Sequence, residues 1–232
     1  MTDAWAVAER GRIVRPPVVT ALFVLVSAGL SLTFPGERWA DALVWHRGAI
    51  EAGELWRLWT GQLVHHGASH TLWDLLVLAG LGVWLEHRSR AVLLWVAGAS
   101  ATGAAAVVFV LRPDVDVYLG SSGIGAGLWV AVAITILREA SNRSEWLVAW
   151  GALCFVPLQI GLALQGLWPE ALSAEGLPTV VEAHLGGALA GAVVAPWWCR
   201  SHGSRSRGDR LTGRSNPLHR GIGGSRPAES RS

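Results

Sequence analysis

Long apolar runs alternate with short polar segments along the chain, as they do in proteins that cross a membrane several times. Six segments approach the roughly 20 apolar residues that a helix needs to span a bilayer core. These segments are Val18–Phe34, His66–Glu86, Ala91–Leu111, Ser122–Leu137, Trp146–Gly166 and Val180–Cys199. The pattern predicts an all-α, polytopic membrane protein. Its six-helix membrane domain covers residues 18–199, between an N-terminal segment, 1–17, and a disordered Arg-rich tail, 200–232.

The composition excludes two broad classes of protein. Hydrophobic residues make up 51% of the 232 residues and charged residues 16%, against about 25% charged in soluble domains. The chain is too apolar to be disordered and carries nothing that indicates nucleic-acid binding. Cys154 and Cys199 both fall in apolar segments, which argues against a disulfide framework or a cysteine metal site. The first apolar run lacks a small-residue cleavage site, so we expect a retained anchor.

The arginines predict the orientation. All 19 basic residues are arginine, and 15 of them lie in segments that share one side of the membrane if the N-terminus is cytoplasmic. Positive residues concentrate on the cytoplasmic side, so both termini are expected in the cytoplasm. The outer segment after the first span holds Trp39, Trp45, Trp56 and Trp59 and should lie at the membrane interface. The basic tail suits contact with anionic lipid.

Polar residues interrupt three of the predicted spans. His70 and Asp74, four residues apart, share one face of the second span, Ser122 opens the fourth, and His184 lies early in the sixth. Such side chains are costly inside a membrane and usually functional. All three spans run from outside to inside, so these residues should lie at a similar depth near the outer surface.

Glycine spacing suggests how Ser122 and His184 come together. Gly123 and Gly127 follow Ser122, and Gly187 and Gly191 follow His184; such spacings allow helices to pack closely in membranes. A serine hydroxyl bonded to histidine is an activated nucleophile. Free N–H groups at the start of a helix can stabilise an oxyanion, and His70 offers a further donor.

Other interpretations remain open at this point. The glycines alone indicate packing, and His184 alone suits a structural histidine. His65 and His66 should lie at the interface, solvated or structural, without a catalytic role. A haem or metal site is a further alternative, because neutral histidine is a good ligand. It would use His65, His66, His70 and His184, but it leaves Ser122 and the glycines without a purpose.

Three motifs in order resemble the rhomboid intramembrane serine proteases. The first is Glu54-Leu55-Trp56-Arg57 with Thr60, His65, His70 and Gly82-x-x-x-Glu86. The second is Gly120-Ser121-Ser122-Gly123 through Gly127, and the third is Ala183-His184-Leu185-Gly186-Gly187 through Gly191. The run from Gly53 to His65 is similar to the rhombosortase branch, whose members process bacterial proteins with C-terminal Gly-Gly sorting tails.

The resemblance implies a site and a reaction. Ser122 would be the nucleophile and His184 the general base, with His70 and the Ser122 backbone N–H forming the oxyanion hole. The substrate would be a transmembrane protein, cut near the outer face of a bacterial cytoplasmic membrane. No metal or organic cofactor is implied. Trp56 and Arg57 would belong to a structural outer segment, and Glu86 to a polar network at the inner end of the second span.

Two residues depart from the family pattern. Asp74 stands where rhomboids usually have asparagine, and an ionised carboxylate cannot donate to an oxyanion. It would help only if protonated, or if it orients His70 or holds a water. Ala126 replaces a larger side chain that packs near the catalytic histidine. These two departures favour an alternative function, that of a catalytically inactive rhomboid-like protein that binds membrane clients.

Overall fold

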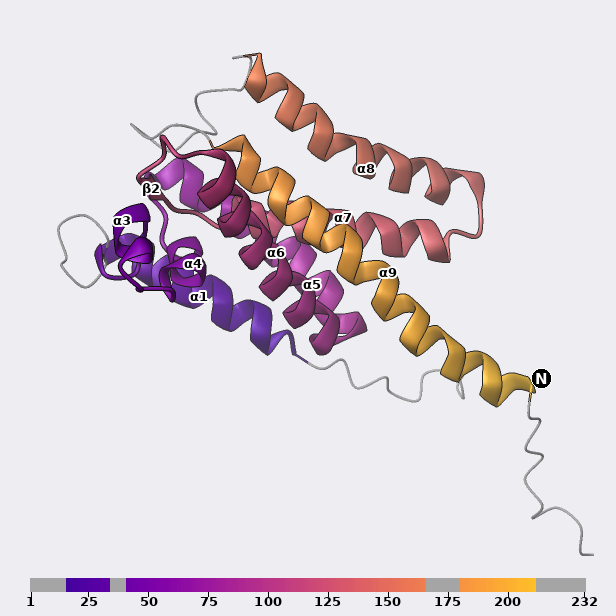
Figure 1. Ribbon diagram of the computed structural model, residues 1–232. Coiled ribbons are helices and arrows are strands. Elements are labelled where there is room, and N and C mark those ends of the chain that lie inside the picture. The colour runs from indigo at the N-terminus through magenta and orange to yellow at the C-terminus, as the bar shows by residue number, and fades with distance from the viewer. Residues whose placement is uncertain (1–15, 34–40, 166–179, 212–232) are drawn as a thin grey trace, which may run out of the picture. The chain divides into compact units, whose positions relative to one another are not determined.

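The computed structural model describes residues 16–33, 41–165 and 180–211, and it consists mainly of helices (Figure 1). Residues 1–198 form one compact unit and 199–232 a second; the contacts between elements given below all lie in the first. The longer helices are α1 (Val18–Thr33), α5 (Ala68–Arg88), α6 (Arg90–Leu111), α7 (Ser122–Glu139), α8 (Arg143–Leu164) and α9 (Val181–Leu211). Short elements are β1 (Trp45–His46), α3 (Arg47–Glu51), α4 (Arg57–Thr60), η1 (Gly61–Leu63) and β2 (Val117–Tyr118).

Each of the six predicted segments overlaps one of the longer helices along most of its length. In the described part of the chain four helices are long and apolar enough to cross a membrane, namely α5, α6, α7 and α8. The protein is therefore an all-α, multi-pass membrane protein. Helix α1 has 16 residues and extends about 24 Å, short of a bilayer core of about 30 Å.

Helix α9 continues beyond the predicted end of the membrane domain at residue 199. It ends at Leu211, so the first part of the predicted disordered tail is helical. Extending an existing helix costs far less than starting one, and arginine is a good helix former. Residues 212–232 lie outside the described residues.

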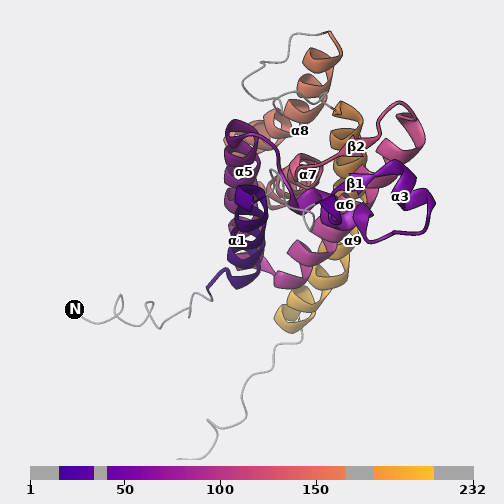
Figure 2. The same ribbon diagram turned by 90° about the vertical axis from the view of Figure 1, so that its left-hand side faces the viewer.

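Helix α7 is central to the membrane domain. It packs against α5, α6 and α8, and Figure 2 shows it between α5 on one side and α9 on the other. Eleven of its 18 residues are buried. Helix α8, by contrast, exposes large apolar residues along its length, which are Trp146, Leu147, Val148, Trp150, Phe155 and Leu158. An apolar face of this size suits lipid contact and would be an aggregation liability in water.

The Trp-rich outer segment differs from its prediction. Trp45 is fully buried, whereas Trp56 and Trp59 are about half exposed, and Trp39 lies outside the described residues. Placing Trp45 at the interface was therefore wrong. Its ring contacts Phe109 and Tyr118 edge to face, each at 6.3 Å between centroids, and its strand β1 pairs antiparallel with β2.

Two arginines hold this Trp-rich segment in place by donating hydrogen bonds to backbone carbonyls. Arg57, 9% exposed, donates to the carbonyls of Asp41 and Val44 and to the Glu54 carboxylate, at 2.6, 2.7 and 2.7 Å. Arg47 donates to four carbonyls at the end of α6 and just beyond it, those of Val108, Phe109, Arg112 and Val115. Because the last carbonyls of a helix lack partners within it, Arg47 acts as a C-terminal cap. The structural role expected of Arg57 is confirmed.

The C-terminal end of α5 carries the polar network predicted around Glu86. The Glu86 carboxylate accepts hydrogen bonds from the backbone N–H groups of Val19 and Thr20 and from the Thr20 hydroxyl. Arg90 Nε donates to it at 3.1 Å. Glu86 therefore satisfies the free N–H groups at the start of α1 and fastens that helix to α5.

Candidate functional site

Helices α7 and α9 approach each other along the predicted glycine faces. A Cβ atom added to Gly127 would lie 2.7 Å from the Gly187 carbonyl oxygen, and one added to Gly191 would lie 2.8 Å from Gly127 Cα. A Cβ on Gly187 would collide with the Gly123 carbonyl. No side chain fits between these backbones. The predicted close approach of the two helices is confirmed, and we call this contact the glycine seam.

The glycine seam brings together the segments that carry Ser122 and His184. Ser122 is the first residue of α7 and His184 lies in the first turn of α9. Their neighbours touch, because a Cβ on Gly123 would lie 3.2 Å from the Ala183 carbonyl oxygen. Both side chains are partly exposed. The Ser122–His184 dyad itself stays a prediction.

His70 and Asp74 face this region from α5. The His70 Nε2 atom lies 3.4 Å from Asp74 Oδ2. Gly120 allows their approach, since a Cβ there would lie 2.7 Å from His70 Cε1. Its φ of 103° is also a conformation that favours glycine.

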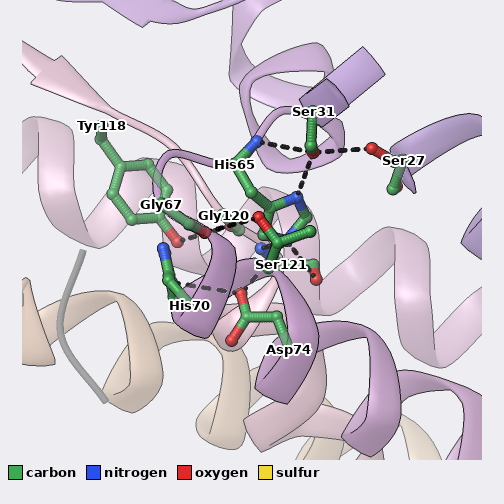
Figure 3. Close-up of polar contacts among 10 residues, drawn as sticks. Ser27, Ser31, His65, Gly67, His70, Asp74, Tyr118, Gly120 and Ser121 are labelled. Atoms are coloured by element: carbon green, nitrogen blue, oxygen red, sulfur yellow. Dashed lines mark hydrogen bonds and ion pairs between the residues drawn. The ribbon is translucent and has the colours of Figure 1, made fainter. Parts of the chain in front are cut away.

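His65 lies in a different environment from the one predicted and contacts the residue before Ser122. We expected a solvated or structural residue at the interface, but His65 is 1% exposed. Its Nε2 atom accepts the Ser121 backbone N–H at 3.1 Å and lies 3.0 Å from Ser121 Oγ. Figure 3 shows its ring between Ser31 and Ser121, above Asp74. His65 comes before α5 begins, so helical periodicity gave no signal for this contact.

The hydrogen bonds of His65 assign its tautomer. The Ser31 hydroxyl donates its single proton to the Ser27 carbonyl at 2.6 Å, so at 3.2 Å His65 Nδ1 must be the donor to Ser31 Oγ. The Nε2 atom then carries the lone pair that accepts from Ser121. Asp74 Oδ2 lies 3.3 Å from this lone pair and has no hydrogen-bond partner. His65 therefore anchors the turn that precedes Ser122.

Tyr118 also reaches the start of α7 and was not singled out by its sequence. Its hydroxyl donates to the Gly120 carbonyl at 3.4 Å, and a Cβ added to Gly123 would lie 3.3 Å from the hydroxyl oxygen. Burial raises the pKa of the Tyr118 phenol, and the negative charge of Asp74 raises it further. The residue therefore keeps its proton at neutral pH.

A partly exposed ion pair joins the first turn of α9 to the end of α6. Arg112 donates to Glu182 Oε2 at 3.0 Å and binds both oxygens of Asp114. The Asp114 carboxylate raises the pKa of Arg112, and Glu182 adds to that effect. Glu182 thus has an ion-pair partner of its own at the start of α9.

The alternative of a metal site gains no support from the described residues. Across residues 16–33, 41–165 and 180–211, no three His, Cys, Asp or Glu side chains are grouped to hold a metal ion. The buried histidines contact serines, a backbone N–H and a carboxylate instead.

Comparison with known families agrees with the order of the motifs. Residues 52–201 match the family model of the Rhomboid domain. The chain belongs to the rhomboid family. Rhomboids are generally intramembrane serine proteases that act on transmembrane proteins. The match covers all three motifs that carry the resemblance, as well as the glycine seam. No curated protein matches the chain as a relative.

Proposed function

We propose that the protein is an intramembrane serine endopeptidase in which Ser122 and His184 form the catalytic dyad. The glycine seam carries this proposal, because it holds the first turns of α7 and α9 in backbone contact. His184 removes the Ser122 proton as the hydroxyl attacks the scissile carbonyl. The tetrahedral intermediate collapses to an acyl-enzyme as protonated His184 gives this proton to the leaving amine. Neutral His184 then takes a proton from the water that hydrolyses the acyl-enzyme.

The oxyanion hole is proposed to consist of the Ser122 backbone N–H and His70. Ser122 is the first residue of its helix, so its N–H has no partner within the helix. Three contacts support a preorganised hole. Gly120 N–H donates to the Val64 carbonyl at 2.8 Å, Ser121 N–H donates to His65, and His70 lies against Gly120. Donors fixed before the reaction are worth most to a developing charge.

The membrane arrangement is proposed to contain six spans, with α1 and α9 joining the four that meet length and composition criteria. Both termini lie in the cytoplasm, and the site faces the outer side of a bacterial cytoplasmic membrane. The arginine distribution supports this orientation, since 15 of 19 arginines then lie inside. The basic C-terminal tail would contact anionic lipid.

The substrate is proposed to be a membrane-anchored protein with a single helix, cut near the outer surface. A helix must unwind locally before its carbonyl can be attacked, so small helix-breaking residues are expected at the cleavage point. C-terminal Gly-Gly sorting tails meet this description. The segment Gly53–His65 supports placing the protein in the rhombosortase branch.

A catalytically inactive, client-binding rhomboid is the second candidate, and Asp74 favours it. Its Oδ2 atom is buried without a hydrogen-bond partner, where the usual asparagine would offer an amide donor. An ionised carboxylate beside an oxyanion opposes the reaction.

Covalent labelling with a fluorophosphonate probe tests the proposal. The purified protein in detergent is compared with Ser122→Ala and His184→Ala, and folding is checked by thermal unfolding. Labelling of the wild type alone is the expected result. A folded wild type that does not label would exclude the dyad and leave the client-binding candidate.

A further inference from the structure

Tyr118 is the one tyrosine in the chain, and its hydroxyl lies over the first turn of α7. The oxygen is 3.4 Å from the Gly120 carbonyl oxygen, and a Cβ added to Gly123 would lie 3.3 Å from it. Gly120 and Gly123 lie on either side of Ser122 in the chain. The phenol therefore lies against the turn that carries the proposed nucleophile.

The surrounding outer layer holds the Tyr118 ring in place. Tyr118 pairs with Trp45 across strands β1 and β2, and the two rings meet edge to face at 85°. Tyr118 is 5% exposed and Trp45 is fully buried. A donor fixed in this way costs little reorganisation when charge develops near it.

The proton of the phenol is available for a stronger bond. Its present acceptor, the Gly120 carbonyl, lies 3.4 Å away, well beyond the usual O–H···O distance of about 2.5–3.0 Å. A negatively charged oxygen within reach would be a better acceptor than this distant neutral carbonyl, because charge strengthens a hydrogen bond.

One donor position of the proposed oxyanion hole is left unfilled by Asp74. An ionised carboxylate has no proton to give, so Asp74 cannot fill the role that asparagine has in related proteins. The charge of Asp74 acts on Tyr118, and Asp74 Oδ2 would lie 3.3 Å from a Cβ on Gly120. Tyr118 and Asp74 therefore border the same turn ahead of Ser122.

We propose that Tyr118 is a catalytic residue whose hydroxyl donates a hydrogen bond to the oxyanion of the tetrahedral intermediate. It supplies the donor that Asp74 lacks. The phenol keeps its proton and exchanges the Gly120 carbonyl for the oxyanion as its acceptor. This role rests on the Ser122–His184 dyad proposed above.

The first test is Tyr118→Phe, which removes the hydroxyl and keeps the ring. Fluorophosphonate labelling should slow about a hundredfold, the typical loss for one oxyanion donor, while the thermal unfolding temperature stays close to that of the wild type. Thr135→Val is the matched control, because it removes a buried hydroxyl of α7 that bonds to Ala131; its labelling rate should not change. A Tyr118→Phe variant that labels at the wild-type rate would overturn the proposal.

A second test uses the fact that the chain has one tyrosine. Replacing tyrosine by mono- and difluorinated analogues throughout the chain changes this residue alone. Fluorine makes the phenol more acidic and a stronger donor, so labelling should accelerate with each fluorine. Labelling rates that do not depend on fluorination would exclude a donor role, even if the Tyr118→Phe variant labelled slowly.

Fluorine NMR separates failure of this inference from failure of the dyad. The resonance of fluorinated Tyr118 should shift in Ser122→Ala and stay unchanged in Thr135→Val. No shift would contradict the placement of Tyr118 against the turn that carries Ser122, whatever the activity. A shift in a protein whose wild type does not label would retain this placement but reject the catalytic role, together with the dyad.

Discussion

Two buried polar networks lie towards opposite ends of α5 and differ in how completely their groups are paired. Towards the C-terminal end of α5, Glu86 accepts four hydrogen bonds from α1 and Arg90. About 18 Å away along the helix axis, Asp74 Oδ2 lies 3.3 and 3.4 Å from the Nε2 atoms of His65 and His70, but it accepts no hydrogen bond of regular geometry, and His70 Nδ1 is likewise buried without one. Both networks also contact α1, the Glu86 network at its first turn and the Asp74 network through Ser31.

The comparison distinguishes a network that holds helices together from a network that belongs to the reactive site. A buried carboxylate whose hydrogen-bonding capacity is filled contributes stability and is available for nothing else. Buried groups without partners cost free energy, and such costs tend to persist where a protein needs reactive or incomplete sites. On this argument the Glu86 network holds helices together, and the network of His65, His70 and Asp74 belongs to the site.

The largest effect is expected from Glu86→Ala. It leaves the N–H groups of Val19 and Thr20 buried without an acceptor, which should lower the free energy of unfolding by about 3–5 kcal/mol. Thermal unfolding in detergent measures the loss. The folded fraction should still label with fluorophosphonate at the wild-type rate. A selective loss of labelling in folded protein would contradict a purely structural role.

Changing His65 should affect both stability and reactivity. His65→Phe keeps a flat ring but leaves Ser121 N–H without an acceptor, at a cost of about 1–3 kcal/mol. The turn before Ser122 then loses its anchor, so we expect labelling to slow about tenfold or more, as for displaced catalytic groups. His46→Ala, at an exposed histidine of the outer segment, is the control. Wild-type labelling in His65→Phe would show that Ser121 is held without it.

A smaller effect of opposite sign is expected from Asp74→Asn. An amide has N–H donors for the His65 Nε2 lone pair or for an oxyanion, where an ionised carboxylate has none. The free energy of unfolding should rise by about 1 kcal/mol or less, and labelling should be faster. Rate and unfolding are measured together on each variant. Complete loss of labelling would mean that the carboxylate itself takes part.

The smallest effect concerns Asp114, an exposed residue that provides a reference for both buried networks. Arg112 holds the pKa of Asp114 below its usual range, so the ionised pair adds stability at neutral pH. This contribution should disappear as the pH falls below about 4, the ordinary range of aspartate, and the carboxyl becomes protonated. Melting temperatures of wild type and Asp114→Asn should therefore differ slightly at neutral pH and converge in acid. A constant difference would exclude the ion pair as its cause.

The helices of the fold could be predicted from the sequence because hydropathy and helix length are local properties. Each of the six predicted segments overlaps a helix, with boundaries shifted by a few residues except at the C-terminal end of α9. The outer segment could not be predicted in this way. The burial of Trp45 depends on pairing with Tyr118, and Arg47 caps a helix that ends 64 residues later in the chain, at Leu111.

Part of the candidate site could also be predicted from the sequence, because the spacing of residues along a helix is a local property. The glycine spacings and the polar residues of α5, α7 and α9 pointed to one region, and the glycine seam joins two of these helices as expected. His65 and Tyr118 lie in non-helical segments, where no periodicity shows which way a side chain points. Their contacts with Ser121 and with the turn that carries Ser122 follow from how the outer layer packs, which depends on long-range contacts.

The glycine seam has a consequence for how the protein tolerates different lipids. A bilayer that thins or thickens can tilt helices, at a modest cost for each ångström of mismatch. It cannot slide α9 along α7, because such a step would drive side chains into backbone at Gly123, Gly127, Gly187 and Gly191. Helix tilt is therefore free to follow the membrane while the spacing between the first turns of these helices stays constant.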